Sequence, residues 1–358
     1  MGQSSPLSEG DANNRRRLRD ELAALNCAIH QPDDPPLFTR EPASPMRPVH
    51  WKWGDLAALL ETLGHELDLE RGGNRRTLRL TNPGLPYGTT PTFWGSIQLI
   101  LPGEVATAHR HAASALRFII KGSGAFTTVE RERYPMNEGD LVLTPNFMWH
   151  DHEHRGEAPM IWLDVLDISL VRSLHATFFA PFESDLQPVS KQPQRSFQLF
   201  GSGIMRPPSA STNGSNPLLV YPVNRAMAAL QAAGELDGDP DLGTVLEYQN
   251  PLTGGPALTT LTPALQALAP GHATRYRRMT ASSLTYVVAG KGTSEVGESL
   301  FDWGPGDFFV IPPWAWHRHQ NLGGHRAVFF TVSDAAAHQA LGLYREERHR
   351  GSGRPGGR

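Results

Sequence analysis

Two histidines stand one residue apart in the stretch 106–124, just ahead of an apolar run. Side chains at positions i and i+2 of a β-strand point to the same side, so an extended segment here directs His109 and His111 into one space. His150 follows a later apolar block, "LTPNFMW", and can supply a third nitrogen from a neighbouring strand. Three neutral imidazoles suit iron, zinc, copper or nickel. Such a set leaves coordination positions open, as a catalytic metal requires.

The elements that must hold these histidines are short strands. From about residue 75 onward, β-type runs such as "FWGSIQLI", "LRFII" and "MIWLDVL" alternate with glycine, proline and asparagine turns. The 35 glycines and 30 prolines favour many short strands over long helices. Evenly spaced short strands predict a barrel or a sandwich. Helices are expected at residues 51–67 and 224–236, where leucine and alanine recur at helical spacing.

The β-rich part of the sequence occurs twice. Residues 116–152 and 284–319 share a Gly-x-Gly pair, a Gly-Asp turn, a proline after an apolar strand and a Trp-His-x-His ending. A period of about 168 residues indicates a duplicated domain, because solenoid repeats are only about 20–50 residues long. Each copy predicts one small barrel. Near Arg277 and Met279 the second copy lacks the first two histidines, so we expect only the first barrel to bind a metal.

Composition limits the class of protein. The 358 residues are 39% hydrophobic and 19% charged, as in globular proteins, and suffice for two domains. A net charge of -3 with both signs mixed gives no case for binding nucleic acid or an anionic membrane. No stretch approaches about 18 consecutive apolar residues. A single cysteine, Cys27, excludes an internal disulfide, so we expect a soluble protein of the reducing cytoplasm.

The motifs around the histidines resemble those of the cupin superfamily. The two cupin motifs are matched by Gly103, His109, His111 and Gly122, and then by Gly139, Pro145 and His150. Where many cupins place a glutamate ligand, this chain has Ala115 or Leu116, depending on the gap. Stretches such as "RGGNRRTLRLTNPGL", "GDLVLTPNFMWHDH" and "NPLTGG" are similar to the gentisate 1,2-dioxygenase family, which also contains salicylate and 1-hydroxy-2-naphthoate dioxygenases. This similarity spans about residues 45–335.

The resemblance implies a mostly β bicupin fold, with two double-stranded β-helix barrels and N-terminal helices. The expected division is an N-terminal helical segment at 1–70, a catalytic barrel at 71–182, a linker with a helix at 183–257, a degenerate barrel at 258–335, and a C-terminal helix and tail at 336–358. The resemblance also implies a homotetramer, or at least a dimer.

The chemistry implied by the resemblance is ring cleavage by dioxygen. Fe(2+) would be held by His109, His111 and His150, and the substrate would be an aromatic 2-hydroxy acid. The ring of gentisate, or of a 5-substituted salicylate, would open between the carboxyl-bearing and hydroxyl-bearing carbons. Salicylate and 1-hydroxy-2-naphthoate are alternative substrates, and a ligand-binding bicupin without activity is a more distant alternative.

Two polar residues near the histidines are expected to act on the substrate. Arg117 lies six residues after His111, an even spacing that places it inward on the same strand, and in the family an arginine here pairs with the substrate carboxylate. Its ordinary alternative is a surface ion pair. His152 shares the face of His150 and is expected to contact substrate or to transfer a proton; the alternative is an exposed loop histidine.

One face of the run "FWGSIQL" carries Trp94, Ser96 and Gln98, because the side chains alternate. The resemblance places these residues in the pocket, with Gln98 near the open metal position and Trp94 against the substrate. A packed tryptophan without a functional role is the alternative.

Two further positions complete the predicted site. Arg75, or its neighbour Arg76, looks like the family's second anion-binding arginine. Asp164, in "WLDVLD", could orient Arg117 or His152 from behind. A turn or capping role would also explain an aspartate there.

Overall fold

The computed structural model describes residues 9–30, 34–66, 76–207, 215–236, 238–351 and 353–355. The chain divides into two compact units, one up to Glu41 and one from Pro42 onward. The first unit contains helix α1 (Glu9–Ala24), and all other helices and strands belong to the second. Among the described residues, no helix is long and apolar enough to cross a membrane.

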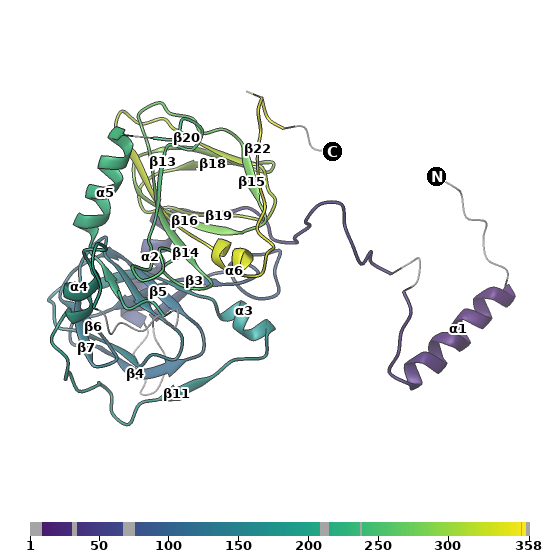
Figure 1. The fold of residues 1–358 in the computed structure, drawn as a ribbon, viewed down its shortest axis with the longest axis horizontal. Coiled ribbons are helices and arrows are strands. Elements are labelled where there is room, and N and C mark those ends of the chain that lie inside the picture. Colours follow the sequence, from purple (N-terminus) through teal and green to yellow (C-terminus); the bar gives the residue numbers. More distant parts are fainter. Residues whose placement is uncertain are drawn as a thin grey trace. The chain divides into compact units, whose positions relative to one another are not determined.

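Two β-barrels form most of the second unit and lie one above the other in Figure 1. Each barrel pairs a six-stranded sheet with a five-stranded sheet. The predicted mostly β architecture with two barrels and N-terminal helices is therefore confirmed.

The first barrel contains the sheets β12-β8-β5-β10-β3-β2 and β11-β4-β9-β6-β7. Its strands are β2 (Arg76–Leu80), β3 (Trp94–Ile100), β4 (Val105–His111), β5 (Ala115–Lys121), β6 (Ala125–Val129), β7 (Glu132–Met136), β8 (Leu141–Thr144), β9 (His150–His154), β10 (Met160–Leu166), β11 (Phe179–Pro181) and β12 (Val220–Tyr221).

The second barrel contains the sheets β1-β19-β16-β21-β14-β13 and β18-β17-β20-β15-β22. Its strands are β1 (Val49–Trp51), β13 (Thr244–Glu247), β14 (Thr262–Leu268), β15 (Arg277–Met279), β16 (Ser283–Ala289), β17 (Gly292–Val296), β18 (Ser299–Trp303), β19 (Phe308–Ile311), β20 (His317–Asn321), β21 (Ala327–Ser333) and β22 (Glu346–Arg348).

Five helices accompany the barrels in the second unit: α2 (Trp53–Glu66), α3 (Ile168–Ser173), α4 (Arg195–Phe200), α5 (Val223–Leu236) and α6 (Ala335–Ala340). Helix α5 confirms the helix predicted at 224–236. The segment predicted as a linker contributes β12 to the first barrel and β13 to the second. The predicted boundary at residue 70 lies in 67–75, outside the described residues, and the other boundaries stay predictions.

The helix predicted from residue 51 begins later, because Val49–Trp51 forms strand β1 at the edge of the second barrel. There β1 pairs with β19, more than 250 residues further along the chain. The carboxylate of Asp307 then accepts a hydrogen bond from the backbone N–H of Trp53, at 2.8 Å, where α2 starts. Helix N-termini carry unsatisfied N–H groups and a partial positive charge, so this distant carboxylate stabilises the start of α2.

The largest hydrophobic cluster joins the two barrels. Phe118 of the first barrel stacks on Phe330 of the second, with ring centroids 4.1 Å apart, and also contacts Tyr286. All three side chains are buried. The barrels therefore share one core, and the strands of the first barrel are fixed from behind by the second.

A reciprocal pair of hydrogen bonds reinforces this contact. The hydroxyl of Thr92, before β3, donates to Asp334 of the second barrel at 2.6 Å. The hydroxyl of Thr260, before β14, donates to Asp167 of the first barrel. Each aspartate also accepts a backbone N–H within its own barrel, from Ser282 or Ser114. The two copies of the duplicated domain are thus joined by equivalent hydrogen bonds in both directions.

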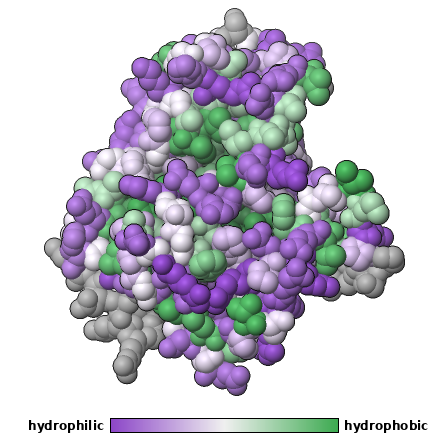
Figure 2. Space-filling view, turned by 90° about the vertical axis from the view of Figure 1, so that its left-hand side faces the viewer, coloured by the Kyte–Doolittle hydropathy of each residue, from purple (hydrophilic) through white to green (hydrophobic). Residues whose placement is uncertain are grey.

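The molecular face in Figure 2 carries hydrophobic residues in small separate patches among hydrophilic ones. This mixture agrees with the interspersed charges of the sequence. It is the ordinary surface of a globular protein, in which scattered apolar residues are common.

Candidate metal centre

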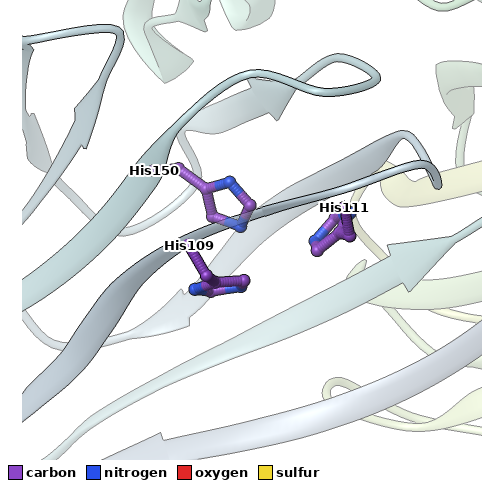
Figure 3. A group of neighbouring side chains, drawn as sticks. All are labelled: His109, His111 and His150. Carbon is purple, nitrogen blue, oxygen red and sulfur yellow. The ribbon is translucent and has the colours of Figure 1, made fainter. Parts of the chain in front are cut away.

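The three predicted metal ligands come from two adjacent antiparallel strands of the first barrel. His109 and His111 belong to β4, and His150 begins β9 directly opposite His109. Figure 3 shows the three rings gathered on one side of these strands. One nitrogen from each ring can be chosen so that all three lie within 4.8 Å of one another. The structure thus brings together the histidines that the sequence predicted.

Backbone carbonyls select which nitrogen of each ring faces a metal. The Nδ1 atoms of His109 and His111 lie 2.7 Å from the carbonyl oxygens of Thr107 and Ala113. In His150 the Nδ1 atom lies 3.0 Å from the carbonyl of Met148. Because a carbonyl oxygen only accepts, each Nδ1 must carry the proton, which leaves the lone pair on Nε2. The backbone therefore orients three Nε2 donors before any ion binds.

The electrostatic environment keeps His150 neutral. Burial lowers its pKa well below the ordinary value, and the positive charge of Arg117 lowers it further. Its Nε2 atom is buried and has no hydrogen-bond partner in the described structure. A buried polar atom without a partner costs free energy, and a bound cation would remove that cost. The donor set therefore fits a divalent transition metal.

Arg117 is a buried cationic residue whose charge acts on His150. The prediction that Arg117 shares a strand with His111 is wrong. Strand β4 ends at His111, and Arg117 lies in β5 of the opposite sheet. Its Nε atom lies 3.0 Å from a carboxylate oxygen of Asp164, and its Nη1 donates to Thr144 at 2.7 Å. The alternative of a surface ion pair is excluded by this burial.

Asp164 lies opposite Arg117 in strand β10 and is also buried. Besides its ion pair with Arg117, it accepts a hydrogen bond from the indole Nε1 of Trp162 at 3.1 Å. Of the two partners that the sequence suggested for Asp164, Arg117 is the one in contact. The indole of Trp162 thus helps to fix the carboxylate that pairs with the guanidinium.

His152 is fully buried, so it is not an exposed loop residue. Its ring centroid lies 6.1 Å from that of His150 and 5.6 Å from that of Trp162. The positive form of His152 would lower the pKa of His150. His152 therefore lies beside His150, on the same strand β9.

Strand β3 supplies the predicted row Trp94, Ser96 and Gln98. Ser96 and Gln98 are buried, and their backbones lie opposite Asp164 and Trp162 in β10. Trp94 starts the strand and is only partly buried.

The ring of Trp94 lies close to two side chains that the sequence did not point to, Tyr87 and Arg79. Its centroid lies 4.5 Å from that of Tyr87 and 4.7 Å from the guanidinium carbon of Arg79. Trp94 therefore belongs to a group of aromatic and cationic side chains at the strand's beginning. Ser96 and Gln98 lie further along β3, opposite Asp164 and Trp162.

Neither of the two candidates for the second anion-binding arginine is confirmed. Arg75 lies outside the described residues. Its neighbour Arg76 is buried and forms an ion pair with Glu104, so its charge is already matched within the protein.

Three residues of the site were missed from the sequence: Thr144 and Trp162, which fix Arg117 and Asp164, and Phe179, which stacks on His109 at 5.3 Å. Thr144 ends the apolar run "LVLT", and its polarity in a buried strand is the one signal that could have marked it.

Comparison with known proteins agrees with this arrangement. The family model for a cupin domain matches residues 96–166 and 264–333, which reproduces the predicted duplication. The 5-aminosalicylate 1,2-dioxygenase of Comamonas sp is 38% identical over 343 residues, covering 94% of this chain and 91% of that protein. The chain belongs to the gentisate 1,2-dioxygenase family. This bicupin family includes 5-aminosalicylate, 1-hydroxy-2-naphthoate and salicylate dioxygenases.

Two further similarities support the assignment to the gentisate 1,2-dioxygenase family. Gentisate 1,2 dioxygenase 1 of Aquipseudomonas alcaligenes is 35% identical, covering 87% of this chain and 90% of that protein. The crystal structure of a salicylate 1,2-dioxygenase from Pseudoaminobacter salicylatoxidans, described as adducts with gentisate, superposes with a TM-score of 0.87 and 28% identity, covering 98% of both chains. The protein is a ring-cleaving dioxygenase of this family.

Proposed function

We propose that the protein is a ferrous dioxygenase that cleaves gentisate or a 5-substituted salicylate. With gentisate, the ring bond between the carboxyl-bearing and adjacent hydroxyl-bearing carbons breaks, both atoms of O2 enter the product, and maleylpyruvate forms. The observation that carries this proposal is a cluster of three neutral Nε2 donors beside a buried arginine. Imidazole ligands suit iron and leave it its full positive charge, which favours an anionic aromatic acid.

The choice of Fe(2+) rests on the donor set and on the family. His109, His111 and His150 would hold the ion through Nε2. When bound, ferrous iron supplies a Lewis-acidic, redox-active centre at which an aromatic acid and O2 can be brought together. The protein residues supply binding, orientation and the exclusion of water.

Arg117 is the residue that we assign to the substrate carboxylate. Its Nε pairs with Asp164 and its Nη1 donates to Thr144, and no hydrogen bond joins its Nη2 to a described residue. The guanidinium is therefore fixed in one plane with its outer edge left for a ligand. A substrate carboxylate would accept charge-assisted hydrogen bonds there, among buried side chains where such bonds are stronger than in water.

His152 and Gln98 are assigned to the other side of the substrate. His152 is buried next to His150 and can exchange a proton with a substrate hydroxyl. Gln98 is buried on β3 and can donate or accept a hydrogen bond near the open metal positions. Trp94 is assigned to the substrate entrance, where its contact with Tyr87 would limit the size of the acid.

A second candidate is a dioxygenase that prefers salicylate or 1-hydroxy-2-naphthoate. It is favoured by the 37% identity to a 1-hydroxy-2-naphthoate dioxygenase. Both candidates share the metal and Arg117, and they differ in the room around the ring. A homotetrameric, cytoplasmic enzyme is also part of the proposal, on family resemblance and on the single cysteine.

The test is oxygen consumption by the purified protein after anaerobic loading with Fe(II). Gentisate, 5-aminosalicylate, salicylate and 1-hydroxy-2-naphthoate are compared at equal concentration, and product is identified by its mass. We expect uptake of one O2 per ring opened, with the highest kcat/KM for a 5-substituted salicylate. His111→Ala should lose iron and activity together, whereas the exposed His325→Gln should keep both. Absence of uptake with all four acids would refute the proposal.

A further inference from the structure

The second barrel keeps part of the metal site's geometry but replaces one ligand by an arginine. Arg277 in β15 lies directly opposite His317 in β20, as His109 lies opposite His150 in the first barrel. The guanidinium Nε of Arg277 donates to Nε2 of His317 at 3.2 Å. A fixed positive charge therefore stands beside the imidazole that would otherwise face a cation.

The backbone orients His317 as it orients His150. The Nδ1 of His317 lies 3.0 Å from the carbonyl oxygen of Ala315, two residues earlier, so Nδ1 carries the proton and Nε2 accepts from Arg277. The ion pair of the first barrel is also replaced. At the positions of Arg117 and Asp164, the second barrel pairs Thr285 with Thr331, whose hydroxyls lie 3.1 Å apart.

A small cavity opens beside this arginine. Its volume is about 90 Å³. Its polar lining includes Thr262, Gln266, Arg277, Ser283, Thr331 and Tyr344. One water needs roughly 10–15 Å³ of such volume, and pockets for drug-sized ligands begin near 300 Å³. The cavity thus suits a few waters or an anion of two or three heavy atoms beyond its carboxylate, and not an aromatic acid.

The carboxylates around the cavity are already engaged or distant from Arg277. Glu346 accepts hydrogen bonds from Tyr344 at 2.9 Å and from Arg348 at 3.1 Å. Asp239 also pairs with Arg348, at 3.1 Å.

A third carboxylate, that of Glu247, lines the same cavity, and burial raises its pKa. Burial lowers the pKa of Arg277, and the charges of Glu346 and Asp239 oppose this shift. Both carboxylates are hydrogen-bonded to Arg348, and among the described residues no ion pair joins either of them to Arg277. A partly buried cation without a carboxylate in direct contact is costly, and a bound anion would offset that cost.

We propose that this cavity binds a small carboxylate anion, which pairs with Arg277 and accepts hydrogen bonds from the neighbouring hydroxyl groups. The guanidinium offers planar, paired donors that match a carboxylate. The second barrel would then be a separate binding site in which arginine takes the place of the metal. This inference does not depend on which aromatic acid the first barrel cleaves.

The test uses fluoroacetate as the probe and the Fe(II)-loaded full-length protein under argon. Binding is followed by the broadening of its 19F resonance, and the dissociation constant comes from titration. Arg277→Gln keeps a donor for His317 but removes the charge, and it should weaken binding at least about tenfold. Arg275→Gln is the matched control, because Arg275 is an exposed arginine paired with Asp241 on the surface; it should bind as the wild type does.

Two further variants protect the test against misfolding. Arg277→Lys keeps the charge without the paired donors and should restore part of the affinity. Ser283→Ala removes one hydroxyl of the lining and should weaken binding a few-fold without changing the iron content. Equal fluoroacetate binding by the wild type and Arg277→Gln would overturn the proposal, as would the absence of any binding by the wild type.

Discussion

Asp164 is expected to contribute to stability by neutralising a buried charge and to activity by orienting Arg117. Asp164→Asn and the double variant Arg117→Met/Asp164→Asn together separate these two contributions. The aspartate and Arg117 are both buried, and their closest charged atoms lie 3.0 Å apart. At that distance, with an effective dielectric constant of about 20, the Coulomb attraction is about 5 kcal/mol. Removing one partner leaves the other charge buried without compensation, which costs about 3–5 kcal/mol. We expect Asp164→Asn to lower the free energy of unfolding by that amount.

The assay compares the thermal midpoints of metal-free wild type, Asp164→Asn and the double variant Arg117→Met/Asp164→Asn. A loss of about 4 kcal/mol should lower the midpoint by roughly 5–8 °C, because the unfolding entropy of so long a chain is large. The double variant has no stranded charge, and its new amide oxygen can still accept a hydrogen bond from Trp162, so it should recover about half of the loss or more. Arg275→Gln, which removes a cation from a pair with Asp241 whose arginine is 56% exposed, should change stability by less than about 1 kcal/mol.

Activity should not follow stability in this series. Asp164→Asn should lower kcat/KM because Arg117 loses the partner that fixes its plane. The double variant, although more stable, should be less active still, since it has no guanidinium for the carboxylate. If the double variant were no more stable than Asp164→Asn, the stranded charge would not be the cause of the loss. Recovery of activity in the double variant would show that Arg117 does not bind the substrate carboxylate.

Three further outcomes are expected. Burial raises the pKa of Asp167 to about 6, so the native state favours its protonated form. This preference stabilises the native state fully below about pH 4, and the stabilisation of about 3 kcal/mol should be lost as the pH rises through 6. The free energy of unfolding, measured from pH 4 to 7, should show this loss in the wild type but not in Asp167→Asn. Removing the metal with a chelator should lower the thermal midpoint, and Fe(II) at a hundred times its dissociation constant should restore about 2.7 kcal/mol; an unchanged midpoint would contradict the metal site. Thr92→Val removes a donor to Asp334 and should cost about 1.5–3 kcal/mol in denaturant unfolding, whereas Thr62→Val, on the exposed side of α2, should cost far less.

The sequence was sufficient to predict the parts of the site that depend on local spacing. His109 and His111 share a face because they are two residues apart in a strand, and His150 was predicted by its place after an apolar block. The burial of Arg117 was predicted correctly but for a wrong reason, since the turn at 112–114 separates it from the strand of His111.

The remaining contacts depend on register between distant strands, which one sequence does not reveal. Thr144 contacts Arg117 across 27 residues, and Asp164 contacts it across the pairing of β5 with β10. The strand Val49–Trp51 has no local signal that distinguishes it from the helix behind it. It is a strand because β19 offers it an edge, which is a case of tertiary structure overriding local propensity.

The retention of a second barrel without the three histidines has a physical reason in the strand that carries Arg117. Along β5, Leu116 and Phe118 face the core shared with the second barrel, while Arg117 points the other way, into the metal-binding barrel. The stack of Phe118 on Phe330 therefore fixes one face of the strand whose other face carries Arg117, the residue that we propose binds the substrate carboxylate. Truncating a buried phenylalanine costs about 3–5 kcal/mol through lost contacts and a cavity. A substitution in the second barrel that loosens this stack should thus shift the position of Arg117 without contacting it. In this way the second barrel can support catalysis without binding a metal of its own.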